Sequence, residues 1–241
     1  MNGVRKHRIR WGYILLAGLG VLLLIQGVTE PSAPVFARMT EQTLILDPGH
    51  GGEDGGAVSR SGQKESEINL AIAQKLDALM GFYGVHTILT RESDVSIHGP
   101  EAETLHEKKV SDLKNRVALI NGIEQGTLIS IHQNSCPNPQ YRGAQVFFAD
   151  ETQSLPLAQA IQEAIGTAVQ EQKPRAPHQI PESVYLMNHI SCRAVLVECG
   201  FLSHPEEETL LQEKAYQIKL AMAMAAGYLR CGTAQEGESL I

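Results

Sequence analysis

Polar side chains that could do chemistry stand at the ends of three apolar segments of the sequence. The segments TLILDPGH, TLISIH and AVLVE end at His50, His132 and Glu198. A fourth candidate, Glu65, follows a Gly-rich stretch at the start of an expected helix. If the apolar segments are strands of one open α/β sheet, their carboxyl ends meet at one edge. The four side chains can then converge although they lie far apart in the sequence.

Two imidazoles and one carboxylate are the ligand set expected of a catalytic zinc ion, whose fourth position stays open for water. Zinc lowers the pKa of a bound water to about 7, and a nearby carboxylate can carry a proton to the leaving group, as amide hydrolysis requires. The chain has nine histidines, however, and a histidine at a strand end is often only a hydrogen-bonded core or loop residue. The absence of an HExxH motif argues against an ordinary helix-borne zinc peptidase. The residues alone leave a metal site and a structural role both open.

The stretch GHGGEDGG, residues 49–56, has to bring His50 and Glu65 around one ion if the metal hypothesis is right. Such a loop needs backbone angles that only glycine reaches cheaply. Asp47 and Asp54 flank His50, and each could either orient its imidazole or cap the loop.

Strand and helix patterns alternate along the chain from residue 43 onward. Strands are expected at 44–46, 85–89, 127–131, 143–148 and 194–197, and residues 175–188 are expected to be irregular. Helices are expected after the Gly-rich stretch, at about 108–123, at 155–169, and twice within 206–230, where the stripe AMAMAAGYL is typical of a helix packed on a sheet. This alternation predicts an α/β fold with helices on both faces of the sheet.

The first 42 residues differ in character from the rest of the chain. The run WGYILLAGLGVLLLIQGV, residues 11–28, has no charge and approaches the roughly 20 residues that span a bilayer. Four basic residues before it predict a cytoplasmic N-terminus and an extracytoplasmic body. The run is either an uncleaved anchor or a signal peptide cut after Ala37, with a buried core helix as the third alternative. We therefore expect a basic tip and anchor or signal peptide at 1–28, a linker at 29–42, a catalytic domain at 43–231 and a flexible tail at 232–241.

Composition limits the partners and the redox chemistry. The formal net charge is -7, and no basic stripe follows the N-terminal tip, so nucleic acid is not an expected partner. Four cysteines are widely spaced and form no CxxC pair, which favours free, partly buried thiols.

Several ordered motifs resemble those of the zinc-dependent N-acetylmuramoyl-L-alanine amidases over residues 43 to about 230. They are ILDPGHGGEDGGA, a Glu before the first helix, SIHQN and VECGFLS. The resemblance implies that His50, Glu65 and His132 bind zinc and that Glu198 is the catalytic glutamate. It also implies a three-layer α/β/α domain around a mixed, mostly parallel sheet of about six strands, with peptidoglycan as the substrate.

The run SDLKNRVALIN, the strand GAQVFF and the N-terminal apolar segment resemble the germination-specific amidases of spore formers. This narrower resemblance implies an enzyme of the spore cortex that takes part in forming muramic δ-lactam. The alternatives are a general cell-wall amidase or autolysin, a zinc peptidase that cuts within the stem peptide, and a catalytically silent wall-binding regulator. The sequence does not identify an activating protein partner.

Some residues near the motifs need separate interpretation. Arg91 and Arg116 are expected to form structural salt bridges, and Asn134 either to fix the loop beside the crevice or to bind peptide backbone. The six other histidines are expected in solvated or structural roles: His86, His98, His106, His178, His189 and His204. The chain departs from residues usual in the family at Gln133, Ser135, Cys199 and His204, and Cys199 beside Glu198 is expected to make the site sensitive to oxidants.

Overall fold

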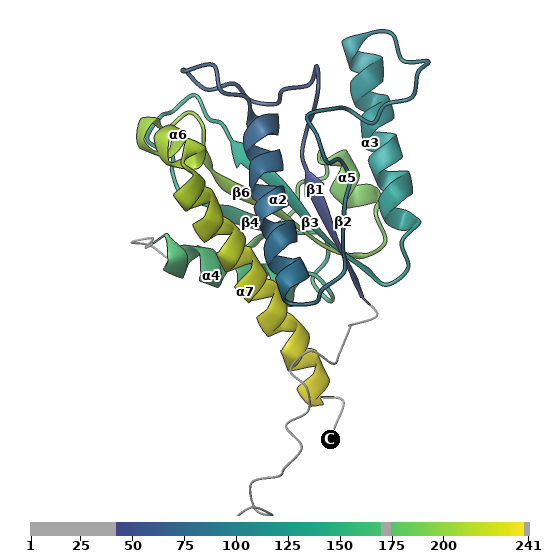
Figure 1. Cartoon of the computed structure of the whole chain (residues 1–241), viewed down its shortest axis with the longest axis vertical. Helices are drawn as coiled ribbons and strands as arrows, with labels where there is room; N and C mark the ends of the chain where they lie inside the picture. Colours follow the sequence, from purple (N-terminus) through teal and green to yellow (C-terminus); the bar gives the residue numbers. More distant parts are fainter. Residues whose placement is uncertain (1–41, 170–174, 239–241) are drawn as a thin grey trace, which may run out of the picture. The chain divides into compact units, whose positions relative to one another are not determined.

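The computed structural model describes residues 42–169 and 175–238 (Figure 1). Within them, six strands form one sheet in the order β2-β1-β3-β6-β4-β5. The strands are β1 (Thr43–Pro48), β2 (Thr87–Leu89), β3 (Gly126–Asn134), β4 (Gln145–Phe148), β5 (His178–Gln179) and β6 (Arg193–Phe201). The first four strands in this order are mutually parallel, whereas β4 is antiparallel to β6 and β5 is parallel to β4. The predicted mixed, mostly parallel sheet is confirmed.

Helices cover both faces of this sheet. They are α2 (Glu65–Phe82), α3 (Leu105–Asn121), α4 (Leu155–Ala168), α5 (Tyr185–His189), α6 (Pro205–Gln212) and α7 (Lys214–Glu238). One apolar core lies between the sheet and α2, α4 and α7, and a smaller core lies between the opposite face and α3 and α5. Figure 1 shows α2 and α7 side by side over the first face. The domain is therefore the expected three-layer α/β/α sandwich.

The central strands are buried on both faces because they consist of nearly continuous apolar residues. Ile129 and Ile131 of β3 contribute to the core under α2, and Leu128 contributes to the core under α3. Apolar side chains thus hold β3 on both sides. The carboxyl end of such a strand is a rigid support for the polar side chain that follows it.

The structure corrects some expected boundaries. Residues 175–188 were expected to be irregular, but they contain β5 and most of α5. Both residues of β5 are exposed and pair with β4 at the sheet edge, so no apolar pattern marks them. β6 continues past Glu198 to Phe201, and only 87–89 of the expected strand 85–89 is paired. α7 extends to Glu238, into the segment expected as a tail, and the flexibility of that segment stays a prediction.

No helix within the described residues has both the length and the apolar character needed to cross a bilayer. The apolar run 11–28 lies outside the described residues, as do the rest of the N-terminal segment before residue 42 and residues 239–241. The expected anchor, signal peptide and linker therefore remain predictions.

Candidate metal centre

The structure brings His50, Glu65 and His132 together at the carboxyl edge of the sheet. Each offers one ligand atom, and these three atoms lie within 4.8 Å of one another. His50 follows β1, Glu65 begins α2 and His132 lies near the end of β3. We call these three residues the His-Glu-His cluster. No other group of three or more His, Cys, Asp or Glu side chains in the described part of the chain meets the same criterion.

The Gly-rich loop permits the close approach of the cluster. His50 has a φ of 63°, a left-handed conformation that is uncommon outside glycine. A Cβ atom on Gly49 would lie 2.1 Å from Cε1 of His132, and one on Gly56 would lie 2.5 Å from Oε2 of Glu65. Both glycines are therefore needed for space, and Gly56, with a φ of 68°, is needed for backbone freedom as well.

The carboxylate of Glu65 is held from several sides. Its Oε2 accepts from the backbone N–H of Ala57 at 2.8 Å, and its Oε1 accepts from that of Gln133 at 3.0 Å. His132 Nδ1 lies 3.0 Å from Oε1, and His50 Nε2 lies 3.4 Å from Oε2. Burial alone would raise the pKa of Glu65, but the bonds to both histidines outweigh it and hold this pKa well below its usual range. Glu65 is thus an anionic oxygen donor with a fixed position.

Asp54 orients the imidazole of His50. Its Oδ2 lies 2.9 Å from Nδ1 of His50, which leaves Nε2 directed toward Glu65. Burial lowers the pKa of His50, but bonding to Asp54 and Glu65 outweighs it and raises that pKa to about 9. A metal ion at the cluster would have to displace this proton, as is usual for histidine ligands. An imidazole backed by a carboxylate is a common arrangement at metal sites.

Asp47, the other aspartate that flanks His50, does not orient the imidazole as Asp54 does. It accepts hydrogen bonds from Thr90 and Ser130, each at 2.7 Å, and pairs with Arg116 at 2.5 Å. Burial would raise its pKa, yet Arg116 and the two hydroxyls lower the pKa of Asp47 to about 2. It is therefore the buried counter-ion of Arg116 and does not contact the imidazole of His50.

Arg91 and Arg116 act through the backbone of the ligand loop. Arg116 donates to the carbonyl oxygens of Pro48 and His50, and Arg91 donates to those of Pro48 and Gly49. Both side chains are buried. Their expected structural role is confirmed, with the addition that their partners include backbone carbonyls of the loop that carries His50.

Glu198 lies across the strand pair from the cluster. It is paired in register with His132 between β3 and β6. Its Oε2 is buried and has no hydrogen-bond partner among the described residues. Burial raises the pKa of Glu198 to about 7, with His132 lowering it and Glu65 raising it further. A cation bound at the cluster would favour the charged form of Glu198, which is the form that can accept a proton.

Two residues that support the cluster escaped prediction. Asn69 donates to the carbonyl of Gly49 and to Oε1 of Glu65, and the Gln133 side chain donates to Asn69. The available signal was the spacing of Glu65 and Asn69, which are four residues apart on one helix face. Asn134 contributes its backbone carbonyl, which accepts from Leu202, and the expected role of its side chain stays a prediction.

The remaining histidines and the cysteines are structural where the structure describes their contacts. His204 caps α6 by accepting from the backbone N–H of Glu207 at 3.4 Å. All four cysteines are free, as expected. Cys199 is fully buried, and burial raises the pKa of its thiol. Because the thiolate is the reactive form, the environment of Cys199 argues against the expected sensitivity to oxidants.

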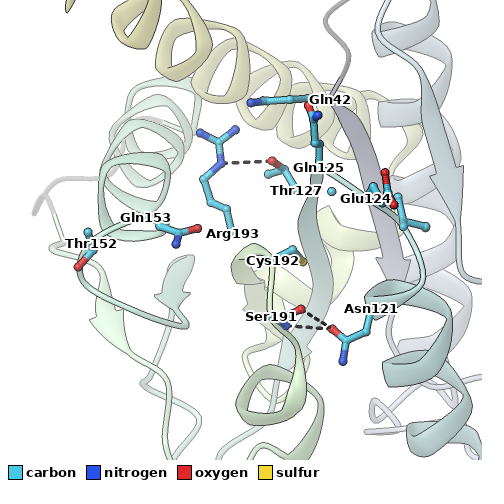
Figure 2. Close-up of a pocket in the computed structure, with 12 residues that line it drawn as sticks. Gln42, Asn121, Glu124, Gln125, Thr127, Thr152, Gln153, Ser191, Cys192 and Arg193 are labelled. Atoms are coloured by element: carbon cyan, nitrogen blue, oxygen red, sulfur yellow. Dashed lines mark hydrogen bonds between the residues drawn. The ribbon is translucent and has the colours of Figure 1, made fainter.

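A hollow lies at the opposite end of the sheet from the His-Glu-His cluster, at the amino ends of β3 and β6 (Figure 2). Its volume is about 540 Å³, and residues of both strands line it, among them Thr127 and Arg193. Figure 2 shows the bond from Arg193 to Thr127, with N–O at 3.2 Å. No member of the His-Glu-His cluster lines this hollow, and neither does Glu198. The hollow and the His-Glu-His cluster therefore lie at opposite ends of the parallel strands β3 and β6.

Two imidazoles and a carboxylate lie at the strand ends of an α/β/α domain, beside a carboxyl group with a buried oxygen. These are side chains that a metal-assisted hydrolase could use. Comparison with known proteins shows to which family of hydrolases the chain belongs. Residues 44–230 match the family described as N-acetylmuramoyl-L-alanine amidase. The germination-specific N-acetylmuramoyl-L-alanine amidase of Bacillus subtilis (strain 168) is 32% identical over 229 residues, covering 93% of this chain and 95% of that protein.

Solved structures agree with this match. The CwlD amidase from Clostridioides difficile, in complex with the GerS lipoprotein, has a TM-score of 0.76 and 37% identity, with 80% of this chain and 98% of that chain covered. An N-acetylmuramoyl-L-alanine amidase from Clostridium difficile 630 has a TM-score of 0.68 and 29% identity, with 78% and 95% covered. The chain belongs to the N-acetylmuramoyl-L-alanine amidase family, and its activity is that of a peptidoglycan amidase.

Proposed function

We propose that the chain hydrolyses the amide bond between N-acetylmuramic acid and L-alanine with a zinc ion held by His50, Glu65 and His132, and that Glu198 is its catalytic residue. The observation that carries the proposal is that Oε2 of Glu198, beside the cluster, is buried and has no hydrogen-bond partner in the part of the chain that the structure describes. An unsatisfied buried carboxyl oxygen is costly. That cost is understandable at a position where a substrate or water supplies the missing partner.

The donor set fits zinc. It offers two nitrogens and one carboxylate, and a site of three protein ligands leaves one position open. When bound, zinc would supply a Lewis acid and a water of lowered pKa. The carboxylate of Asp54 keeps the imidazole of His50 in one orientation, and the backbone donors of Ala57 and Gln133 keep Glu65 in place.

Glu198 moves the proton in this proposal. Its carboxylate accepts a proton from the attacking water and delivers it to the nitrogen of the departing L-alanine. A cation at the cluster would favour the charged form of Glu198, which accepts the proton, whereas burial, which raises its pKa, favours the protonated form that then delivers it.

The biological setting that we propose is the spore cortex, with a part in forming muramic δ-lactam. The similarity to the Bacillus subtilis germination-specific amidase supports this setting. Because peptidoglycan lies outside the cytoplasmic membrane, the catalytic domain would act there, attached through the N-terminal segment or exported by it. The Clostridioides difficile relative is in a complex with a lipoprotein, which supports the proposal that this chain also works with a protein partner.

The test is digestion of purified cortex and vegetative peptidoglycan in parallel, followed by mass analysis of the products. An amidase leaves intact stem peptides and bare glycan, whereas a peptidase leaves shortened peptides on the glycan. Elemental analysis should find one zinc per chain. Release of stem peptides at the parent rate by Glu198→Gln or His132→Ala would show that these roles are wrong, and equal digestion of both substrates would contradict a specific cortex role.

A further inference from the structure

Behind the His-Glu-His cluster, two buried amide side chains form a hydrogen-bonded pair that the proposed reaction does not use. Asn69 of α2 and Gln133 of β3 are 0% and 3% exposed. Gln133 Nε2 donates to Oδ1 of Asn69 at 3.1 Å. Because burying an amide costs free energy unless it is hydrogen-bonded, the pair needs a reason to be there.

The contacts of this amide pair reach Glu65 directly, and they involve the chain neighbours of His50 and His132. Asn69 Nδ2 donates to Oε1 of Glu65 at 3.4 Å and to the carbonyl of Gly49 at 3.1 Å, directly before His50. The backbone N–H of Gln133 donates to the same Oε1 of Glu65 at 3.0 Å. Gln133 also directly follows His132 in the chain. The pair thus connects helix α2, the loop after β1 and the end of β3.

The strand pairing is irregular at this point. His132 pairs with Glu198, but Asn134 pairs with Phe201, so Gln133 alone stands opposite both Cys199 and Gly200. Such a bulge bends a strand and redirects its side chains, and bulges are frequent next to active sites. Cys199, whose thiol is buried, is one of the two residues opposite Gln133. Two positions where this chain departs from the residues usual in its family are therefore neighbours in space.

The amide of Gln133 is poorly explained as a stabilising feature. Its Oε1 is buried and has no hydrogen-bond partner among the described residues. Such an acceptor typically costs about 1–3 kcal/mol, so the bond from Gln133 satisfies Oδ1 of Asn69 but leaves another acceptor unsatisfied. Positioning of the Glu65 carboxylate explains why a polar residue stands there.

We propose that Asn69 and Gln133 are positioning residues that fix Glu65 and the Gly49 carbonyl, so that the three metal-binding side chains are arranged before the ion binds. This inference rests on the proposed metal function. Residues that support metal ligands typically change metal affinity by about 10–100-fold when they are replaced. The expected effect is therefore on zinc affinity rather than on folding.

The experiment uses the full chain, purified in detergent, as parent, Gln133→Met and Asn69→Ala. The zinc Kd is measured by competition with a chromogenic chelator at fixed pH, and thermal unfolding is followed for the metal-free protein. The matched control is Gln162→Met. Gln162 of α4 is also buried, but its amide bonds to the backbone of Val146 and Ala144.

We expect Gln133→Met and Asn69→Ala to weaken zinc binding about tenfold or more. Gln133→Met should also leave the unfolding temperature close to that of the parent, since it removes one unsatisfied acceptor and creates another on Asn69. Gln162→Met should lower the unfolding temperature and leave the zinc Kd unchanged. Parent-like zinc affinity in both test variants, or an equal loss in the control, would overturn the inference alone. A parent chain without zinc affinity would overturn the proposed function as well.

Discussion

Three glycines in and after the loop that carries His50 differ in what an alanine would cost there. One would impose backbone strain, one would lack space for a Cβ atom, and one would have both problems. Gly62 has a φ of +89° with no atom within 4 Å of a built Cβ. Gly49 has no positive φ, but its Cβ would lie 2.1 Å from the His132 ring. Gly56 combines a φ of +68° with a Cβ 2.5 Å from Oε2 of Glu65. Alanine at each position therefore tests a different cost.

The magnitudes follow from these geometries. Left-handed backbone costs a residue with a Cβ about 1–2 kcal/mol, so Gly62→Ala should lower the unfolding temperature by roughly 2–8 °C. Gly49→Ala requires the His132 ring to move by about 1 Å, a displacement that can reduce catalysis about 100-fold. Gly56→Ala carries both penalties, because its φ is positive and its Cβ would displace the Glu65 carboxylate. That carboxylate is held in place by Ala57 and Gln133.

The assay combines thermal unfolding with release of stem peptides from purified peptidoglycan. Gly62→Ala should lose stability and keep parental activity per folded molecule. Gly49→Ala should lose about two orders of magnitude of activity with a smaller loss of stability than Gly56→Ala. If Gly49→Ala stays fully active while Gly62→Ala does not, the glycines serve flexibility rather than close approach, and the reasoning from space is refuted.

Three further predictions concern charge and thiol chemistry. Folding lowers the pKa of Asp47 from 3.8 to about 2, so its charged form contributes about 2 kcal/mol above pH 4 that is lost as the pH falls toward 2. Urea unfolding should show a loss of stability over this range that is about 2 kcal/mol smaller in Asp47→Asn than in the parent. A remaining loss is expected in both, because folding also lowers the pKa values of Glu65 and Asp54. Asp54→Asn should weaken zinc binding about tenfold in a chelator competition, and an unchanged Kd would contradict its orienting role. A thiol reagent should label the half-buried Cys136 and Cys192 in the native chain before it labels Cys199, which is buried. Mass analysis of the labelled peptides gives the order of labelling. Labelling of Cys199 first would contradict its burial.

Strand-end residues were predictable because apolar runs in the sequence mark both the strands and the points where they stop. His50 and His132 follow such runs, and parallel pairing of β1 with β3 and of β3 with β6 brings their ends to one edge. The meeting of these residues with Glu65 follows from the layer architecture and the short Gly-rich loop. The sequence alone could not separate ligands from hydrogen-bonded core histidines, because that difference depends on distances of a few ångströms.

The supporting contacts could not be predicted in the same way. Arg116 lies 66 residues from its acceptor His50, and no local pattern marks a guanidinium that binds a distant carbonyl. The bulge opposite Gln133 leaves no signal in apolar periodicity either, since it comes from one unpaired backbone position. The short β5 was missed because its two exposed residues are held only by edge pairing.

The conformation of His50 connects these distant contacts with the chemistry. A left-handed histidine costs of order 1–3 kcal/mol and persists only where its surroundings hold it. Here Arg116 donates to its carbonyl at 2.7 Å and Asp54 accepts from its ring at 2.9 Å, so both ends of the residue are fixed. Arg116 is in turn neutralised by Asp47 and Asp112, which makes its burial tolerable. Loss of this ion-pair network should therefore release the strain at His50 and disorder the cluster, even though Asp47, Asp112 and Arg116 are not among the cluster's donor atoms.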